Sequence, residues 1–382
     1  MTAVSVQGAG MTRFGRHPDR TPRDLVEEAV AAALDDAGLE PGDVDAVVVG
    51  NAVDGLMTGQ ESVRGQVVLR GTGIRGVPVV NTENACASGA VAAHLGWQSI
   101  VAGLHRRVLV VGYEKLVHPD REKAFRAFDA SMDLAEMHAL HPSPPTDRTI
   151  FMDHYADRSD LDEDVLAEIA AKNHTHGALN PLAQYRTPLD AAEVLASRPI
   201  VGPLRLRMCA PMGDGAAAVV LSSDDGPVQI RASAMTSGRG DDASLPTAVS
   251  RAASLAYERA GVGPDELDLV ELHDATAVGE LELYAQLQLC APGSESSLVR
   301  GGSTRLGGAR PVNTSGGLLA RGHPIGATGV AQLVELHTQL TGRGGARQVT
   351  GARIAMAQNL GGIVGTDVAC AVVHVLAGGT SQ

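Results

Sequence analysis

The chain has 382 residues, a length that favours two similar core units, or one pseudo-symmetric pair, over a single core. Hydrophobic residues make up 44% of it and charged residues 20%, proportions that exclude a disordered or fibrous protein and are typical of a globular enzyme. The formal net charge of -13 disfavours nucleic acid as a partner, because binding to a phosphate backbone needs a basic face.

Targeting segments and cysteine spacing narrow the class of protein further. Residues 1–16 lack the charged and then apolar run of a secretion signal, and no stretch approaches the length of a membrane span, so we expect a cytoplasmic protein. The four cysteines, Cys86, Cys209, Cys290 and Cys370, lie far apart and form no CxxC pair. This spacing disfavours zinc and a disulfide framework, and we predict that the chain has no metal site.

A helix, a turn and a strand occur twice along the chain. Residues 23–51, RDLVEEAVAAALDDAGLEPGDVDAVVVGN, have the pattern of a helix, a proline-containing turn and an apolar strand. The same pattern returns about 223 positions later in residues 247–275, with Gly38 in register with Gly261. We therefore predict an internal duplication, and the alternation of helices with strands indicates a layered α/β fold.

A long segment interrupts this pattern. Residues 116–208 are rich in His, Asp, Pro and Met, and we interpret them as an inserted loop or lid region. We expect residues 1–115 together with 209–225 to form the N-terminal half, and residues 226–382 to form the C-terminal half.

The first candidate catalytic residue is Cys86, in the sequence NTENACASGA, where a helix rich in small residues begins. A thiol at a helix N-terminus is close to unpaired N–H groups and to the positive end of the helix dipole, which lower its pKa. We therefore predict that Cys86 is a nucleophile, and that the other three cysteines pack as small apolar side chains.

His323 is the candidate base. It lies in VNTSGGLLARGHPIGATG, residues 312–329, in a glycine-rich turn that comes just before a helix. A thiol nucleophile needs a group that takes its proton, and a neutral imidazole suits that task near pH 7. We expect Cys86 and His323 to converge from opposite halves of the duplicated fold.

Two further motifs offer groups that could stabilise an oxyanion. His273 and Asp274 end an apolar strand, where ligands collect in α/β folds, and His273 could donate to a thioester oxygen. In the sequence from Asn359 to Gly362, the backbone N–H of Gly361 could approach the same oxygen.

Together, NACASG, CAPMGDGAAAVVL at residues 209–221, the HDA strand end and the GHPIG turn resemble the thiolase superfamily, in its sterol-carrier-protein-2 or lipid-transfer-protein branch. The resemblance covers nearly the whole chain. It implies a duplicated, five-layered αβαβα fold with an inserted loop domain that covers pantetheine. It also implies that Cys86 becomes acylated, that His323 activates it and that His273 helps to form an oxyanion hole.

The chain departs from the thiolase pattern at three positions. Members of the family carry a second reactive cysteine, at the position of Asn359 or, in this branch, of Ala275. Thr276 replaces a bulky aromatic residue, so we expect a pocket for larger or branched acyl groups around Ala275 and Thr276. The missing proton-transfer group could be His323 itself or a histidine of the insertion, His138 or His141.

Three functions stay open from the sequence. The first is a thiolase-type acyltransferase that acts on a 3-oxoacyl-CoA, with coenzyme A as co-substrate and no permanently bound cofactor. The second is a retro-aldolase that acts on a β-hydroxyacyl-CoA, and the third is an acyl-CoA-binding subunit without activity. The resemblance implies a homodimer, and a possible small partner with an OB-fold and a zinc ribbon.

Overall fold

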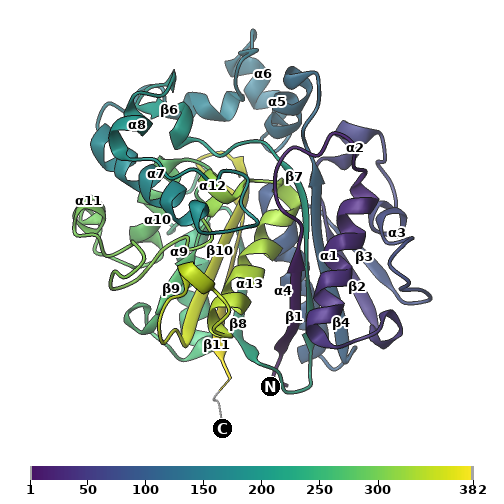
Figure 1. The fold of residues 1–382 in the computed structure, drawn as a ribbon. Helices are drawn as coiled ribbons and strands as arrows, with labels where there is room; N and C mark the ends of the chain where they lie inside the picture. Colours follow the sequence, from purple (N-terminus) through teal and green to yellow (C-terminus); the bar gives the residue numbers. More distant parts are fainter. Residues whose placement is uncertain (1, 380–382) are drawn as a thin grey trace.

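Helices and strands alternate in layers in this structure, a computed structural model that describes residues 2–379 (Figure 1). Nine strands form one hydrogen-bonded sheet in the order β3-β2-β4-β7-β1-β8-β11-β10-β9. The first five of these belong to the N-terminal half: β1 (Ser5–Met11), β2 (Ala46–Gly50), β3 (Val79–Thr82), β4 (Arg107–Lys115) and β7 (Asp214–Ser222). The other four belong to the C-terminal half: β8 (Val228–Ser237), β9 (Leu269–Glu271), β10 (Ile354–Val364) and β11 (Asp367–Gly378).

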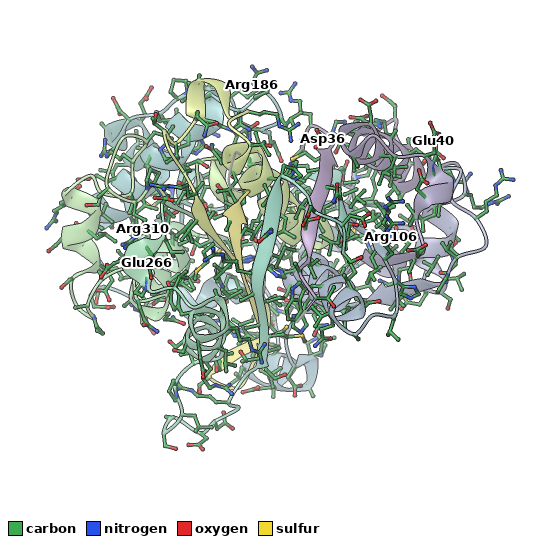
Figure 2. The ribbon with its side chains drawn as sticks, turned by 90° about the horizontal axis from the view of Figure 1, so that it is seen from below. Asp36, Glu40, Arg106, Arg186, Glu266 and Arg310 are labelled. Atoms are coloured by element: carbon green, nitrogen blue, oxygen red, sulfur yellow. The ribbon has the colours of Figure 1, made fainter. Side chains whose placement is uncertain are left out.

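The two halves of the sheet are joined where β1 pairs with β8, through Ser5 with Gln229 and Val6 with Val228. From below, Glu40 and Arg106 mark one side of the molecule, whereas Glu266 and Arg310 mark the other (Figure 2). These residues lie in the loops of the N-terminal and the C-terminal half respectively, so the halves lie side by side.

Helices cover both outer faces and fill the space between the halves. On the N-terminal half, α1 (Pro22–Ala37) packs on β1, β4 and β7. On the C-terminal half, α9 (Ala248–Ala260) packs on β8 and β11. Between the halves, α4 (Ser88–Val101) and α13 (Thr328–Leu340) contact each other and strands on both sides. The predicted five-layered α/β architecture is confirmed.

The alternating direction of side chains along each strand explains why helices can pack on both faces of the sheet. In β2, Val47 and Val49 belong to the core that contains the buried residues of α1, whereas Val48, between them, belongs to the core around α4 and α13. Neighbouring side chains of a strand point to opposite faces, so a strand that is apolar throughout can be buried on both of its faces.

The duplication is visible in local detail. Thr21 and Thr247 each accept a backbone N–H at the start of α1 and α9, which is the usual role of an N-cap threonine. Gly38 and Gly261 end these helices with φ angles of 63° and 64°, a left-handed conformation that favours glycine. The short turns η1 (Pro41–Asp43) and η5 (Pro264–Glu266) then lead towards β2 and β9.

The remaining elements lie mostly between β4 and β7, in the segment that interrupts the repeat. These are α5 (Arg121–Asp129), α6 (Leu134–Leu140), η3 (Ile150–Tyr155), α7 (Glu163–Ala178), α8 (Ala191–Leu195), β5 (Pro199–Val201), β6 (Leu204–Arg205) and η4 (Leu206–Met208). Outside it are α2 (Asp54–Thr58), α3 (Arg64–Val68), α10 (Ala277–Gln286), α11 (Glu295–Arg300), α12 (Gly317–Arg321) and η7 (Gly345–Arg347). Among residues 2–379, no helix combines the length and apolar character needed to cross a membrane.

Candidate active site

Cys86 lies in a tight turn that leads directly into the central helix α4. The turn is η2 (Ala85–Ala87), and Ala85 has a φ of 48°, which residues other than glycine rarely adopt. Two side chains hold it: Glu83 accepts the Ala85 N–H at 2.6 Å, and the Ser88 hydroxyl donates to the Ala85 carbonyl at 2.7 Å. The fold therefore fixes the strained backbone just before the thiol.

The pKa of the Cys86 thiol is shifted in the opposite direction from the one that its position at a helix start predicts. Burial, followed by the negative charge of Glu114, raises the pKa of Cys86 to about 12. The expected lowering by the helix N-terminus is therefore wrong for the resting protein, because desolvation penalises the thiolate. Cys86 is a neutral thiol at rest, and its proton must leave before the sulfur can attack.

His323 lies just before the turn that leads into the other central helix, α13. It precedes the turn η6 (Ile325–Ala327), which leads into α13 as η2 leads into α4. The Thr328 hydroxyl donates to the Pro324 carbonyl at 3.0 Å, so its oxygen accepts the Nδ1 proton of His323 at 2.7 Å. This arrangement assigns the proton to Nδ1 and leaves a lone pair on Nε2, which is buried without a hydrogen-bond partner among the described residues.

His273 follows β9 and faces His323. Its backbone N–H donates to Gln358 Oε1 at 3.0 Å, and its ring meets that of His323 edge to face, with centroids 5.1 Å apart. Burial, assisted by the charge of Arg321, lowers the pKa of His273 to about 3. Burial, with His273 and Arg321 nearby, also holds the pKa of His323 well below its usual value. Both imidazoles are neutral at physiological pH.

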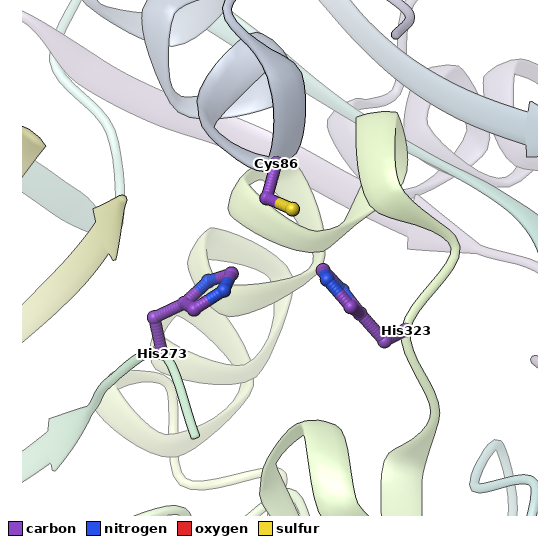
Figure 3. Close-up of side chains that lie close together, drawn as sticks. All are labelled: Cys86, His273 and His323. Atoms are coloured by element: carbon purple, nitrogen blue, oxygen red, sulfur yellow. The ribbon is translucent and has the colours of Figure 1, made fainter. Parts of the chain in front are cut away.

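Cys86, His273 and His323 come together as the sequence predicts (Figure 3). The Cys86 sulfur and one ring nitrogen from each histidine all lie within 4.8 Å of one another. A thiol and two imidazoles are also zinc-ligand types, so this cluster is where a thiophilic ion could bind. The same spacing would let a thiol nucleophile and two imidazole proton carriers reach one substrate carbon.

Asp274 holds the start of α12, the helix that precedes His323. Its buried carboxylate accepts the N–H groups of Leu318 at 2.7 Å and Leu319 at 3.2 Å, at the start of α12, and the side-chain amide of Asn173 at 2.7 Å. Burial raises the pKa of Asp274 above its usual value, despite these hydrogen bonds. Because α12 leads directly to His323, Asp274 fixes the path of the chain into the histidine turn.

Gly361 and Asn359 lie on β10 beside the cysteine turn. A Cβ at Gly361 would lie 2.1 Å from the Asn84 carbonyl oxygen and 2.5 Å from the Ala87 nitrogen, so glycine allows this close approach. The Asn359 amide donates to Gln332 of α13 at 3.0 Å, while its oxygen is buried without a partner among the described residues. Asn359, at whose position the family resemblance implied a cysteine, contacts the central helix α13.

A cavity of about 720 Å³ opens over these residues, and its wall includes Cys86, His273, His323, Ala275 and Thr276. The Thr276 hydroxyl accepts the Gly279 N–H at 3.1 Å and thereby caps α10. Cys209, which we predicted to be ordinary packing, also lines this cavity, and burial raises its pKa to about 12. A second cavity, of about 380 Å³, is also lined by Cys86.

The two histidines suggested as proton carriers lie elsewhere. His138 is exposed on α6, which packs inward through its neighbour Met137, and it does not line either cavity. His141 lies 3.6 Å from the carboxylate of Asp153 and likewise lines neither cavity. Neither His138, which we also expected in the substrate pocket, nor His141 is therefore placed to carry a proton at Cys86 in this structure.

Several residues around the site were missed from the sequence. Thr328 holds the Nδ1 proton of His323, Arg321 lowers the pKa of both His273 and His323, and Glu114 raises the pKa of Cys86. Glu114 could have been found, because it ends the apolar run VLVVGYE just as His273 ends another strand. Thr328 carries no such signal, since a threonine at a helix start is common as a cap.

Two family models account for most of the chain. Residues 4–189 match the thiolase N-terminal domain, and residues 232–376 match the thiolase C-terminal domain-like family. The chain belongs to the thiolase family. As a thiolase with acetyltransferase relatives, it is an acyltransferase.

Curated relatives place this thiolase in the branch that the motifs indicate. It is 35% identical to acetyl-CoA acetyltransferase of Methanothermobacter thermautotrophicus, over 98% of this chain and 99% of the relative. It is 34% identical to sterol carrier protein 2 of Oryctolagus cuniculus, over 94% of this chain and 70% of the relative. Benzoylsuccinyl-CoA thiolase subunit BbsB of Thauera aromatica is 32% identical, over 94% of each chain.

Solved structures show the same fold. The thiolase aligns with an Ltp2-ChsH2(DUF35) aldolase at a TM-score of 0.78 and 22% identity, over 100% of this chain and 99% of the other. It aligns with human mitochondrial 3-ketoacyl-CoA thiolase in complex with CoA at a TM-score of 0.72 and 20% identity, over 99% and 98% of the chains. The predicted thiolase fold is confirmed.

Proposed function

We propose that this thiolase transfers an acyl group between a 3-oxoacyl-CoA and coenzyme A through an acyl-Cys86 intermediate. The observation that carries the proposal is the cluster of Cys86, His273 and His323 on the wall of one large cavity. A thiol beside two neutral imidazoles has both the nucleophile and the proton carriers that acyl transfer needs.

In the cleavage direction, His323 Nε2 takes the Cys86 proton as the sulfur attacks the 3-oxo carbon. The bond between C2 and C3 then breaks, C3 stays on the sulfur as a thioester, and C2 leaves as the carbanion of the shorter acyl-CoA. The carbanion takes a proton from an imidazolium. In the second half, the thiol of free coenzyme A gives its proton to a histidine and attacks the acyl-Cys86, which regenerates the thiol.

His273 is our candidate for the oxyanion donor, together with the backbone N–H groups of Cys86 and Gly361. Residue 275 is alanine and residue 359 is asparagine. Among the described residues, no second cysteine belongs to the cluster of Cys86, His273 and His323. The two histidines must therefore share the proton transfers at sulfur and at C2. Arg321 contributes to keeping both imidazoles neutral at rest, because its positive charge disfavours their protonated forms.

Coenzyme A would enter through the mouth of the large cavity. Arg16, Arg121, Arg148 and Arg198 line this cavity, although the whole chain carries a net charge of -13. Guanidinium groups suit phosphates, so we assign the diphosphate end of coenzyme A to this region and its thiol end to Cys86. Residues 116–208, which supply three of these arginines, would form the lid over pantetheine.

A bulky or branched acyl group fits the wall formed by Ala275 and Thr276. Because Thr276 caps α10, Thr276→Phe would remove the cap as well as fill space, and Ala275→Phe is the cleaner variant. We expect Ala275→Phe to lose more activity on 2-branched 3-oxoacyl-CoA than on acetoacetyl-CoA. Equal losses on both substrates would contradict the assignment of this wall to the acyl group.

A panel of 3-oxoacyl-CoA substrates, with branched and aromatic ones included, tests the activity itself. Wild type should cleave at least one substrate in the presence of free coenzyme A, and Cys86→Ala should be inactive although folded. Absence of cleavage with every substrate would contradict the proposed function and favour an acyl-CoA-binding subunit.

The second candidate is a retro-aldolase that cleaves a β-hydroxyacyl-CoA. Two observations favour it: no second cysteine lies with Cys86, His273 and His323 among the described residues, and one structural neighbour is named an aldolase. One histidine would remove the hydroxyl proton and the other would protonate C2. Cys86 takes no part in that reaction, so a Cys86→Ala variant that still cleaves the substrate would establish the aldolase.

We further propose a homodimer, and binding of a small OB-fold and zinc-ribbon partner. BbsB is named as a subunit, and the Ltp2 neighbour is a complex with ChsH2(DUF35), which supports a partner for this chain. Full activity and a stable dimer for the isolated chain would remove the need for that partner. The cytoplasmic location stays a prediction from the sequence.

A further inference from the structure

Glu114 is a fully buried carboxylate at the end of β4, and it accepts hydrogen bonds from both halves of the fold. From the N-terminal half, Oε1 accepts the Asn51 amide at 2.8 Å and the Val53 N–H at 3.3 Å, and Oε2 accepts the Ala52 N–H at 3.1 Å. From the C-terminal half, Oε2 accepts the Gly326 N–H at 3.2 Å. Four donors on two oxygens match the ionised form of the carboxyl group.

The bond to Gly326 ties the histidine turn to the half of the molecule that carries Cys86. Gly326 lies in η6, three residues after His323. A Cβ there would lie 2.5 Å from the Tyr113 carbonyl oxygen and 2.8 Å from the Asn51 Cα, so the turn rests directly on the ends of β2 and β4. Glu114 is thus the side chain that crosses from the strand end to the turn of His323.

Glu114 also acts on the thiol through its charge. It is the second cause, after burial, of the raised pKa of Cys86, and Glu83 adds a smaller effect of the same sign. Burial raises the pKa of Glu114 itself to about 7, although its backbone donors oppose this. The other ionisable groups around it are Asp54, which is bonded to the Tyr113 hydroxyl at 2.7 Å, and Arg64, which is bonded to Asn51 at 2.9 Å.

We propose that Glu114 is a positioning residue that holds the His323 turn against the Cys86 turn, and that its charge adds to the burial that disfavours the Cys86 thiolate. The inference rests on the proposed function of Cys86 and His323. Loss of Glu114 would have two opposite consequences for the reactivity of Cys86. Loss of its charge would make the thiolate easier to form. Loss of its hydrogen bond to Gly326 would displace His323, the base that acylation needs.

Glu114→Gln tests both effects at pH 8, where the wild-type residue is ionised. We expect alkylation of Cys86 by iodoacetamide, followed on the peptide that contains Cys86, to be about three- to tenfold faster, because a lost neighbouring charge of the same sign lowers the thiol pKa. We expect kcat for 3-oxoacyl-CoA cleavage to fall about tenfold or more, because Gln cannot accept all four hydrogen bonds.

Glu114→Asp separates the two effects, because it keeps the charge but is too short to span the same four donors. It should lower kcat with no increase in alkylation rate. Asp54→Asn is the matched control: it removes a buried carboxylate of the same cluster that does not bond to Gly326. This control should leave kcat and the alkylation rate within about twofold of wild type.

Two results would overturn the proposal. A Glu114→Gln variant that alkylates no faster than wild type would reject the effect on the thiol, and one with kcat within twofold of wild type would reject the positioning of His323. Thermal unfolding of each variant identifies a folding defect, and Glu114→Asp then replaces Glu114→Gln for the positioning test. Alkylation needs no substrate, so its outcome stands even if no 3-oxoacyl-CoA is cleaved and the proposed function fails.

Discussion

At the scale of single residues, the reacting groups are all uncharged at rest. The pKa of Cys86 is raised to about 12 and that of His273 is lowered to about 3, both mainly by burial. A thiolate–imidazolium pair is therefore not the resting state. In the mechanism that we propose, the proton moves from sulfur to Nε2 of His323 when a bound thioester excludes the remaining water and an oxyanion begins to form.

Thr328 determines which nitrogen of His323 can accept the proton of Cys86. Its oxygen accepts the Nδ1 proton of His323, so Nε2 is left as the proton acceptor. We predict that Thr328→Val lowers kcat/KM about five- to a hundredfold, the effect of leaving a buried donor without a partner, about 1–3 kcal/mol. The measurement is steady-state cleavage of a 3-oxoacyl-CoA from pH 6 to 9.

Thr338→Val is the matched control for Thr328→Val. Thr338 also lies in α13 and also donates to the carbonyl four residues before it, at 2.8 Å, but it bonds to no histidine. Equal losses in the two variants would show that the effect comes from the helix and not from the tautomer of His323.

At the scale of elements, the site depends on the close meeting of β10 with the turn η2. We predict that Gly361→Ala destabilises the fold by about 1–3 kcal/mol and slows acylation of Cys86, because its Cβ would overlap two backbone atoms of that turn. Urea unfolding and single-turnover kinetics measure the two effects.

Gly42→Ala is the control for this prediction, since a Cβ at Gly42 in η1 meets no atom within 4 Å. The variant should keep the stability and the acylation rate of wild type. If Gly361→Ala behaves like Gly42→Ala, the strand and the turn are not in the tight contact described.

The sequence contains most of the information about these elements. The repeated pattern around Gly38 and Gly261 predicted helix ends that the structure has at those residues, because a left-handed C-terminal residue strongly favours glycine. The meeting of Cys86 with His323 followed from the duplication. These features depend on local periodicity and on symmetry, which a sequence displays directly.

Other features depend on packing that a sequence does not display. The pKa of Cys86 was expected to fall because the helix end is visible in the sequence, whereas its burial and the distant Glu114 are not. The sequence allowed His138 to act as a proton carrier. In the structure, α6 buries Met137, and His138 beside it is exposed. The capping role of Thr276 likewise became visible only with the start of α10 in place.

At the scale of the whole molecule, buried neutral histidines make stability depend on pH. Burial lowers the pKa of seven histidines below the usual 6.5: His94, His174, His176, His273, His323, His337 and His374. Below pH 6.5 the unfolded chain binds protons that the folded chain excludes, so each histidine costs about 1.4 kcal/mol per pH unit until its folded pKa is reached.

Four buried carboxyl groups with raised pKa values, Glu114, Asp129, Glu271 and Asp274, act in the opposite direction, because the folded chain then binds the extra proton. The histidines outnumber them. We predict that the melting temperature falls steadily as the pH is lowered from 6.5 to 4.5, and differential scanning calorimetry would show this. A level or rising melting temperature over that range would contradict the neutral state of these histidines.

The covalent step through Cys86 is the central claim, and intact-protein mass spectrometry tests it most directly. Wild type is mixed with a cleavable 3-oxoacyl-CoA in the absence of free coenzyme A, so that the second half of the reaction cannot follow. The mass should increase by that of one acyl group, located on the peptide that contains Cys86, and Cys86→Ala should gain nothing. Product formation without any adduct, or the same adduct in Cys86→Ala, would contradict an acyl-Cys86 intermediate.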